Sequence, residues 1–217
     1  MAELSNPFRK PAYDTRQFDE LPRTMSASIY PVIANQILER TGITRGACLD
    51  VGSGPAPLAI ALAWISNLQV TALDPSPEMF ARAQKNIHRS HMEDRVVPVT
   101  GEVHAIPAAD ATFSLVVSRS SYHSWADLPT AFREIHRVLR PGGSAYIGEG
   151  YGSAAIRDEV LADRNEQGLA DDRDPYARAG FQSLRSGEIE AAMGSASIPE
   201  YRIINDTTGF WILFRKT

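Results

Sequence analysis

The chain has 217 residues, 43% of them hydrophobic and 22% charged, with a formal net charge of −4. This composition is ordinary for a soluble globular domain, and the weak negative charge gives no electrostatic case for a nucleic-acid partner. The one cysteine, Cys48, excludes an internal disulfide framework, and no apolar run approaches the roughly 20 residues that span a bilayer. We therefore expect a cytoplasmic protein whose partner is neither a nucleic acid nor a membrane.

The first 25 residues are polar and interrupted by prolines, which predicts an N-terminal tail or flap without the pattern of a secretory signal. Apolar residues then recur at helical spacing from about residue 26 to residue 40, and Gly42 follows as a stop signal. Tyr30 lies near the start of this expected helix, where it faces either the core or a ligand.

Residues 47–51 form a short apolar run typical of a buried strand, and a glycine-rich loop follows directly. Gly52 and Gly54 allow a sharp turn and a close approach of the backbone to a ligand, because neither carries a Cβ atom. Pro57 suits the first turn of a helix, which an alanine-rich run continues to residue 65. A strand, a glycine turn and a helix N-terminus in this order indicate a nucleotide site.

The same alternation continues along the chain. Strands are expected at 69–73, 96–100, 113–118 and 144–149, and helices at 76–90 and 128–139, the second ended by Pro141-Gly142-Gly143. Strands that alternate with helices through short connections predict a parallel sheet with helices on both faces. Ligands of such sheets bind at the carboxyl ends of the strands, where Asp74, Glu102 and Ser118 stand.

The C-terminal third departs from a plain dinucleotide fold. Residues 150–185 are polar and charge-rich, and we expect a lid-like insert there. A helix is expected at 186–193, followed by strands at 201–205 and 210–214 whose four-residue link requires an antiparallel hairpin. The predicted fold class is α/β, a Rossmann-like, doubly wound, mostly parallel seven-stranded sheet closed by an antiparallel C-terminal hairpin.

Four ordered segments carry a family resemblance. They are the loop at 49–56, the stretch 72–79 around Asp74, Gly101-Glu102-Val103, and the run Phe-Arg-Glu-Ile-His-Arg-Val-Leu-Arg-Pro-Gly-Gly at 132–143. The chain resembles the class I S-adenosylmethionine-dependent methyltransferases, in particular the type 11 group with its ubiquinone and menaquinone biosynthesis enzymes. The resemblance covers residues 26–217 and implies a single domain that binds S-adenosylmethionine and passes its methyl group to a small-molecule acceptor.

The resemblance assigns the methionine and ribose end of the cofactor to the first two segments. Backbone groups of Gly52, Ser53 and Gly54 are expected near the methionine carboxylate and the ribose. Asp74 offers two carboxylate oxygens to the vicinal hydroxyls of the ribose. The third glycine of the family's loop is Ala56 here, a small change that we expect cofactor binding to tolerate.

The adenine end is assigned to later segments. Glu102 or the Val103 N–H is expected at the adenine edge, and Met79 at the adenine face, with core packing as the alternative for Met79. Further cofactor contacts are expected from Tyr30, Asp50, Pro75, Ser118 and Arg119. Aromatic residues expected either at the acceptor or in the core are Trp125, Tyr176, Phe181 and Trp211.

A nicotinamide dinucleotide is the rival ligand. Its fingerprint would need glycine at position 57 for close packing of the helix, and Pro57 stands there. The acid after the second strand suits both ligands and does not discriminate between them. The terminal hairpin and the Gly101-Glu102 turn favour the methyl donor.

The donor's chemistry limits what the protein must supply. Its sulfonium methyl is already activated, so transfer needs mainly alignment and desolvation, and a base only when the acceptor carries a proton. His123 is the expected base, with Tyr122 as the second catalytic candidate, although a histidine hydrogen-bonded within a loop remains the alternative. No spacing of His and Cys indicates a metal site. The other function class is a protein that binds the cofactor without transferring its methyl group, or uses it for other chemistry.

Overall fold

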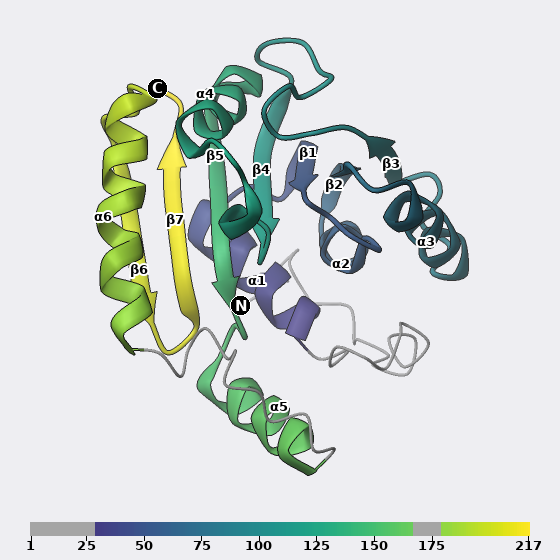
Figure 1. Ribbon diagram of the computed structural model, residues 1–217. Helices are drawn as coiled ribbons and strands as arrows, with labels where there is room; N and C mark the ends of the chain where they lie inside the picture. The colour runs from purple at the N-terminus through teal and green to yellow at the C-terminus, as the bar shows by residue number, and fades with distance from the viewer. Residues whose placement is uncertain (1–28, 167–178) are drawn as a thin grey trace, which may run out of the picture.

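The computed structural model describes residues 29–166 and 179–217. In this part of the chain the strands are β1 (Arg45–Val51), β2 (Asn67–Asp74), β3 (Val96–Thr100), β4 (Phe113–Arg119), β5 (Leu139–Gly150), β6 (Tyr201–Asp206) and β7 (Gly209–Arg215). The helices are α1 (Ile29–Thr41), α2 (Pro57–Ile65), α3 (Pro77–Arg89), α4 (Leu128–Val138), α5 (Ala154–Glu166), α6 (Ala179–Ser195) and the short 3-10 helix η2 (Tyr122–Ser124) (Figure 1).

The described strands form one seven-stranded sheet in the order β3-β2-β1-β4-β5-β7-β6. Parallel pairing joins β3, β2, β1, β4 and β5 in turn. β7 runs antiparallel between β5 and β6. The predicted fold class is therefore confirmed, including the hairpin that closes the sheet. The strand order reverses between β1 and β4, and ligands of parallel sheets bind beyond the carboxyl ends of the strands at such a switch point.

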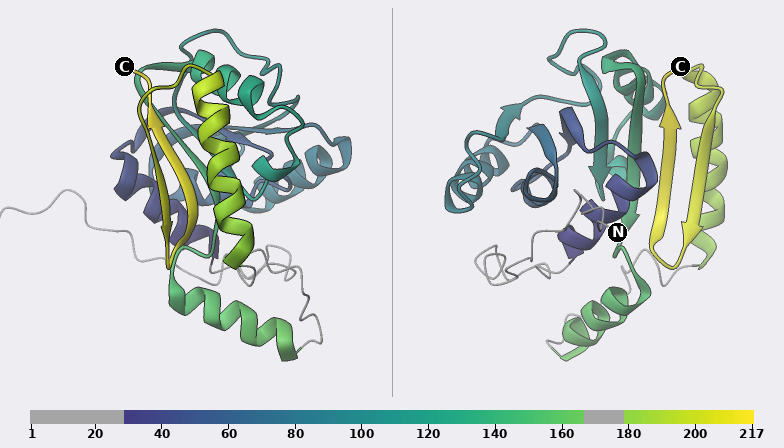
Figure 2. Two further views of the ribbon diagram at one scale, coloured as in Figure 1. Left: turned by 60° about the vertical axis from the view of Figure 1, so that its left-hand side comes forward. Right: turned by 180° about the vertical axis from the view of Figure 1, so that it is seen from behind.

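Both faces of the sheet are buried, because successive residues of a strand point to opposite faces. In β1, Cys48 packs in the core under α1, α2 and α3, whereas its neighbour Leu49 packs in the core under α4 and α6. β4 repeats the alternation with Val117 in the first core and Val116 in the second. Figure 2 shows helices on both faces, with α5 extending beyond the carboxyl end of β5.

Local signals in the sequence explain where the helices begin. Ser76 caps α3 by accepting a hydrogen bond from the Met79 backbone N–H (3.3 Å), and Pro77 occupies the first turn as predicted. Asp127 caps α4 in the same way, accepting from the Thr130 N–H at 3.0 Å. In the described residues no helix is long and apolar enough to cross a bilayer.

A buried polar network places α1 against the hairpin. The Arg40 guanidinium donates to the Tyr146 hydroxyl (2.7 Å) and pairs with the Asp206 carboxylate (2.9 Å), and the Gln36 amide hydrogen-bonds the same hydroxyl at 2.6 Å. Burial raises the pKa of Tyr146 to about 12, so this hydroxyl stays protonated. The network joins segments more than 100 residues apart and thereby holds the C-terminal half of α1 against β5 and the β6–β7 turn.

The structure corrects the start of two elements. β5 begins at Leu139 and not at Ser144, because Leu139 already pairs with Phe113 across an irregular step of the ladder that contains Pro141-Gly142-Gly143. α6 begins at Ala179 and is longer than the expected 186–193. Within the expected insert, the structure contains the helix α5. The part of the insert from 167 to 178 lies outside the described residues, and so does the expected tail at 1–25.

Candidate functional site

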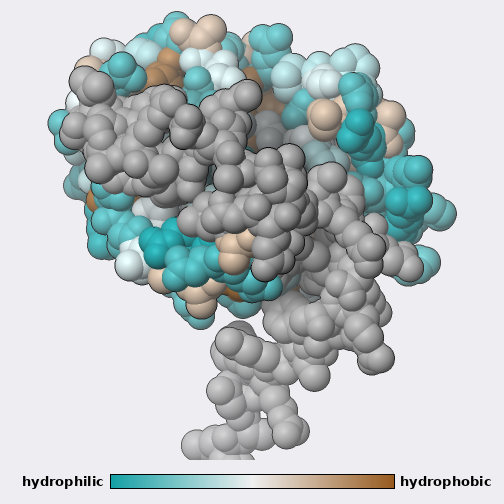
Figure 3. Space-filling model, turned by 60° about the horizontal axis from the view of Figure 1, so that its bottom comes forward, coloured by the Kyte–Doolittle hydropathy of each residue, from teal (hydrophilic) through white to brown (hydrophobic). Residues whose placement is uncertain are grey.

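A cavity of about 410 Å³ lies where β1 and β2 end and where the chain leaves β3 and β4. Five residues expected at the cofactor line it: Gly52, Asp74, Pro75, Glu102 and Val103. Residues that the sequence did not single out line it as well: His104, Ser120, Ser121 and Ser124. Figure 3 shows the molecule from the end toward which β4 and β5 point, and the described residues in view there are mostly hydrophilic.

The loop after β1 is held in an unusual backbone conformation. Gly52 and Gly54 both have positive φ, at 66° and 53°. A Cβ on Gly52 would lie 2.5 Å from the Cβ and Oγ atoms of Ser121, so this position requires glycine for steric reasons as well. The third positive φ of the loop, 65°, falls on Ala56, where a side chain costs roughly 1 kcal/mol. The backbone path of the loop therefore survives the replacement of the family's third glycine.

The Asp74 carboxylate joins two loops at the cavity wall. Its Oδ2 accepts the Gly54 N–H (2.8 Å) and its Oδ1 accepts the Ser76 N–H (2.9 Å). Because each carboxylate oxygen has a second lone pair, both oxygens can still accept hydrogen bonds from a ligand. The two backbone donors fix the plane of the carboxylate, which is the orientation that a bidentate contact with two neighbouring hydroxyls needs.

Two polar atoms below the loop lack partners among the described residues. The Oδ2 of Asp50, a residue 2% exposed, and the Oγ of Ser53 are buried without a hydrogen bond. Burial raises the pKa of Asp50 to about 8, a hydrogen bond from the Ala59 backbone N–H lowers it, and the charge of Asp74 raises it further. Buried polar groups are seldom left unpaired, so this end of the site suits a ligand that brings donors and a positive charge.

The end of β4 is tied to the loop by serine hydroxyls. The Oγ atoms of Ser118 and Ser121 lie 2.6 Å apart, and the Ser121 hydroxyl donates to the Val51 carbonyl (3.1 Å). Ser120 has a positive φ of 57°, an uncommon conformation for a side chain outside glycine. Strained backbone of this kind clusters at functional sites. Ser120 and Ser121 were not singled out from the sequence; the signal that could have identified them is the polar run directly after an apolar strand.

Arg119 and Tyr30 interact with each other beside β5 and do not line the cavity. The Arg119 guanidinium donates to the Gly150 carbonyl (3.2 and 3.1 Å) and lies over the Tyr30 ring at 5.2 Å from its centre. Burial raises the pKa of Tyr30, and the charge of Arg119 lowers it. Arg119 therefore links β4, β5 and α1, with its Nη1 3.5 Å from the Tyr30 hydroxyl.

The two catalytic candidates meet a buried acid at the end of β5. The Tyr122 hydroxyl donates to Oε1 of Glu149 (3.2 Å), and the His123 Nδ1 lies 3.9 Å from Oε2 of the same residue. Glu149 is 7% exposed, whereas the His123 side chain is 39% exposed. A hollow of about 150 Å³ lies beside them, and its wall includes Trp125, which also lines the large cavity, and Glu188.

Of the remaining expected residues, those that the structure describes do not line the cavity. Met79 is half-buried on α3 and is not part of the cavity wall. Trp211 is fully buried and stacks on Tyr146 at 4.9 Å between ring centres, which makes it a core residue. Tyr176 lies outside the described residues, as does the side chain of Phe181.

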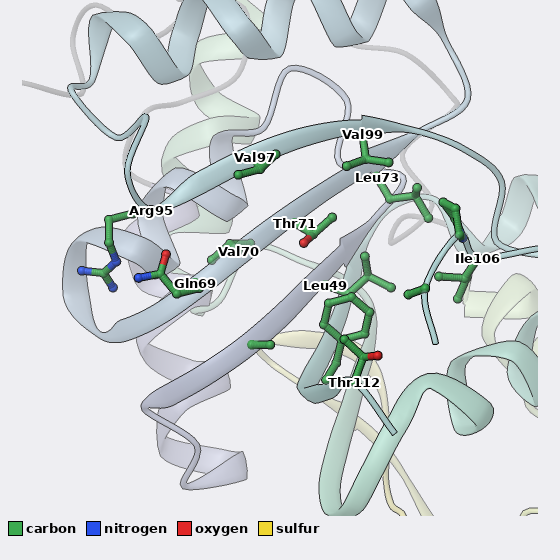
Figure 4. A pocket seen from close by; sticks show the side chains of 14 residues that line it. Leu49, Gln69, Val70, Thr71, Leu73, Arg95, Val97, Val99, Ile106 and Thr112 are labelled. Carbon is green, nitrogen blue, oxygen red and sulfur yellow. The ribbon is translucent and has the colours of Figure 1, made fainter. Parts of the chain in front are cut away.

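A second hollow, of about 330 Å³, lies over the face of β1, β2 and β3 (Figure 4). Its wall is mainly apolar, with Leu49, Val97 and Val99 along it and Arg95 toward one end. It contains neither a carboxylate nor a histidine, and it lies over the middle of the strands. The cavity at the strand ends is therefore the candidate active site.

Comparisons with known proteins identify the family of the chain. A family model described as a methyltransferase domain matches residues 49–147. A malonyl-[acyl-carrier protein] O-methyltransferase from Geobacter sulfurreducens is 30% identical over 79% of this chain and 72% of its own length. The crystal structure of a proposed S-adenosyl-L-methionine-dependent methyltransferase from Methanococcus maripaludis superposes with a TM-score of 0.85 at 40% identity, covering 100% of this chain and 97% of that one. The chain belongs to the S-adenosylmethionine-dependent methyltransferases.

The family assignment confirms the methyl donor that the resemblance of the four ordered segments implied. A demethylmenaquinone methyltransferase from Chlorobaculum parvum is 38% identical over 99 residues, which are 46% of this chain and 39% of that protein. This chain therefore spans about two fifths of that relative's length. The two curated relatives are named for different acceptors, one a quinone precursor and the other a protein-bound malonyl group. What they share with this chain is the donor domain.

Proposed function

We propose that this chain transfers a methyl group from S-adenosylmethionine to a small-molecule acceptor, as a single domain at 26–217 with a lid-like insert at 150–185. The observation that carries the proposal is the cavity at the switch point, in which Gly52, Asp74 and Glu102 come together from the ends of three strands. Bound there, S-adenosylmethionine supplies a methyl group on a sulfonium sulfur, which an acceptor takes by in-line displacement.

The chain's own groups suit the parts of this donor. Asp74 accepts hydrogen bonds from two hydroxyls, and Glu102 with the Val103 N–H faces the cavity where an adenine edge would be read. The unpaired Oδ2 of Asp50 and Oγ of Ser53 are placed for the ammonium and carboxylate of the methionine part. These buried, unpaired polar atoms support the proposal that the loop after β1 holds the methionine part of the donor.

His123 is the proposed base for an acceptor that carries a proton. The Glu149 carboxylate lies 3.9 Å from its Nδ1, so the other ring nitrogen is the one proposed to take the proton of the acceptor. Tyr122 donates to the same carboxylate and is buried, so we propose a supporting role for it. The hollow beside His123 is the proposed place for the acceptor.

Donor binding is tested by Asp74→Ala. The substitution removes charged hydrogen bonds of the Asp74 carboxylate and is expected to weaken binding of S-adenosylmethionine by about 1–3 kcal/mol. Titration calorimetry measures the affinity. Asp94→Ala, which removes an exposed acid beyond α3, is the matched control and leaves the affinity unchanged. Equal affinities for the wild type and Asp74→Ala would contradict the assignment of Asp74.

The alternative, a protein that binds the donor without methyl transfer, is separated by a second measurement. Incubation of the protein with methyl-labelled donor and a metabolite extract gives a labelled small molecule if the proposal is correct. Tight donor binding with no labelled product would favour the alternative. The hollow beside His123 supports the enzyme, since donor binding alone does not need it.

A further inference from the structure

The connection between β3 and β4, residues 101–112, is a thin wall between two hollows. Its first part, Gly101 to His104, lines the proposed donor cavity. Its second part, Ile106 to Ala108, lines the apolar hollow over the sheet in Figure 4. No helix forms in this connection, and its one ladder contact is an isolated bridge between Glu102 and Ala105. Each part of the segment therefore borders a hollow on one side. The side chains of Val103 and Ile106 are buried in the core, and the backbone around them needs further contacts to keep its position.

Two charged residues of α4 supply such contacts and thereby anchor the segment. The Glu134 carboxylate accepts the Ile106 backbone N–H (3.0 Å), and Arg137 donates to the Ile106 carbonyl (3.0 Å) and the Ala108 carbonyl (2.9 Å). Arg137 also pairs with Asp110 at 2.7 Å. Between themselves Arg137 and Glu134 form two hydrogen bonds of 2.8 Å, so that each fixes the other.

The hydrogen bonds between Glu134, Arg137 and the loop are partly shielded from solvent. The side chains of Glu134 and Arg137 are 20% and 30% exposed, whereas Asp110 is 78% exposed. A bidentate pair with rigid geometry contributes more than an exposed single contact. A further contact ties the front of the loop to the same helix, because the His104 ring nitrogen Nε2 accepts the Asp127 backbone N–H at 3.2 Å.

We propose that Glu134 and Arg137 are positioning residues for the methyl donor: they hold the wall at 101–112 where Glu102 and the Val103 N–H meet the adenine edge. The inference rests on the proposed function of the cavity. Neither side chain lines the cavity, so both act through the loop. Loss of the anchor lets the loop move toward the apolar hollow, and the adenine contacts lose their geometry.

The test compares two arginines of one helix. Arg137→Met removes the donors to the loop, whereas Arg133→Met removes an arginine whose bonds go to the Ser195 carbonyl and the Thr130 hydroxyl. Titration calorimetry with S-adenosylhomocysteine is expected to show about a tenfold loss of affinity for Arg137→Met and none for Arg133→Met. The same titration with S-inosylhomocysteine, which carries hypoxanthine in place of adenine, is expected to show that Arg137→Met loses most of the wild-type preference for adenine.

A merely structural role would lower the melting temperature without changing this nucleobase preference. Hydrogen exchange of the ligand-free protein gives a second readout: the Ile106 amide, which donates to Glu134, exchanges faster in Arg137→Met than in Arg133→Met. If Arg137→Met does not fold, Asp110→Asn weakens the same anchor from an exposed position, with an expected loss of about twofold to threefold.

The outcomes separate the two proposals. A wild-type protein that binds neither nucleoside would overturn the proposed function and the inference with it. Wild-type binding with adenine preference, combined with identical affinities and preferences in Arg137→Met and Arg133→Met, would overturn the inference alone. A selective loss in Arg137→Met, with normal behaviour of Arg133→Met, supports it.

Discussion

The donor cavity and the hollow beside His123 lie on two sides of Trp125, yet they are built differently. The donor cavity is lined largely by short segments that follow the ends of parallel strands. The hollow combines η2, the start of α4 and Glu188 of α6, which are distant in the chain. The contrast suits a domain that binds one donor while relatives are named for different acceptors, since function depends on the site more than on the fold.

The largest expected effect is a loss of methyl-transfer rate from a change on the acceptor side. His123→Gln removes the proposed base and lowers the rate of methyl transfer to a proton-bearing acceptor by about 100-fold or more, with donor affinity unchanged. Single-turnover rates and donor titrations measure the two quantities separately. His88→Gln, on the exposed face of α3, is the control. An unchanged rate in His123→Gln would remove this residue from the mechanism.

On the donor side, substitution of a loop glycine is expected to destabilise the folded protein. Gly52→Ala combines a positive φ with a Cβ contact of 2.5 Å to Ser121, and we expect it to lower the free energy of unfolding by about 2–4 kcal/mol. Gly54→Ala meets no atom within 4 Å and carries only the strain of its φ, about 1 kcal/mol. Denaturant unfolding of both variants measures the difference, and equal losses would show that Ser121 does not restrict the loop.

The next effect depends on pH and on Asp50, and over a single pH unit it is smaller than the loss expected for Gly52→Ala. Its folded pKa of about 8 lies above the unfolded value of 3.8, so between these values the folded protein holds more protons. The free energy of unfolding of the ligand-free protein therefore falls as pH rises from about 4 to 8, by at most about 1.4 kcal/mol per pH unit. Asp50→Asn removes this contribution. Donor affinity changes in the opposite direction, rising with pH up to about 8, because a charged carboxylate pairs with the donor's ammonium.

The smallest effect concerns the alanine in the loop. Ala56→Gly relieves a φ of 65° and is expected to stabilise the protein by about 0.5 kcal/mol, because the greater freedom of glycine in the unfolded chain offsets part of the gain. Ala61→Gly, inside α2, is the control and destabilises by about 1 kcal/mol. A loss of stability in Ala56→Gly would show that packing of its methyl group outweighs the strain.

The sequence alone predicted most of the donor side. Its signals are local: Gly52 and Gly54 after an apolar run, an acid at position 74 before a Ser-Pro-Glu helix start, and a glycine at 101. Each signal reflects a steric or hydrogen-bonding need of a few neighbouring residues, and parallel topology then brings the strand ends together. The closing hairpin followed from the short link between two predicted strands, whereas the order of the strands in the sheet came only from the structure.

Residue placement depended on tertiary structure wherever partners are far apart in the chain. Nothing near position 119 indicates that Arg119 is directed to Gly150 and Tyr30, and nothing near position 137 indicates that Arg137 holds the loop at 106–110. The unpaired Oδ2 of Asp50 is likewise invisible in the sequence, because burial and missing partners are properties of the packed core. The family resemblance of a few short local segments indicated which donor the chain is built for, and long-range packing decided which side chains hold that site in place.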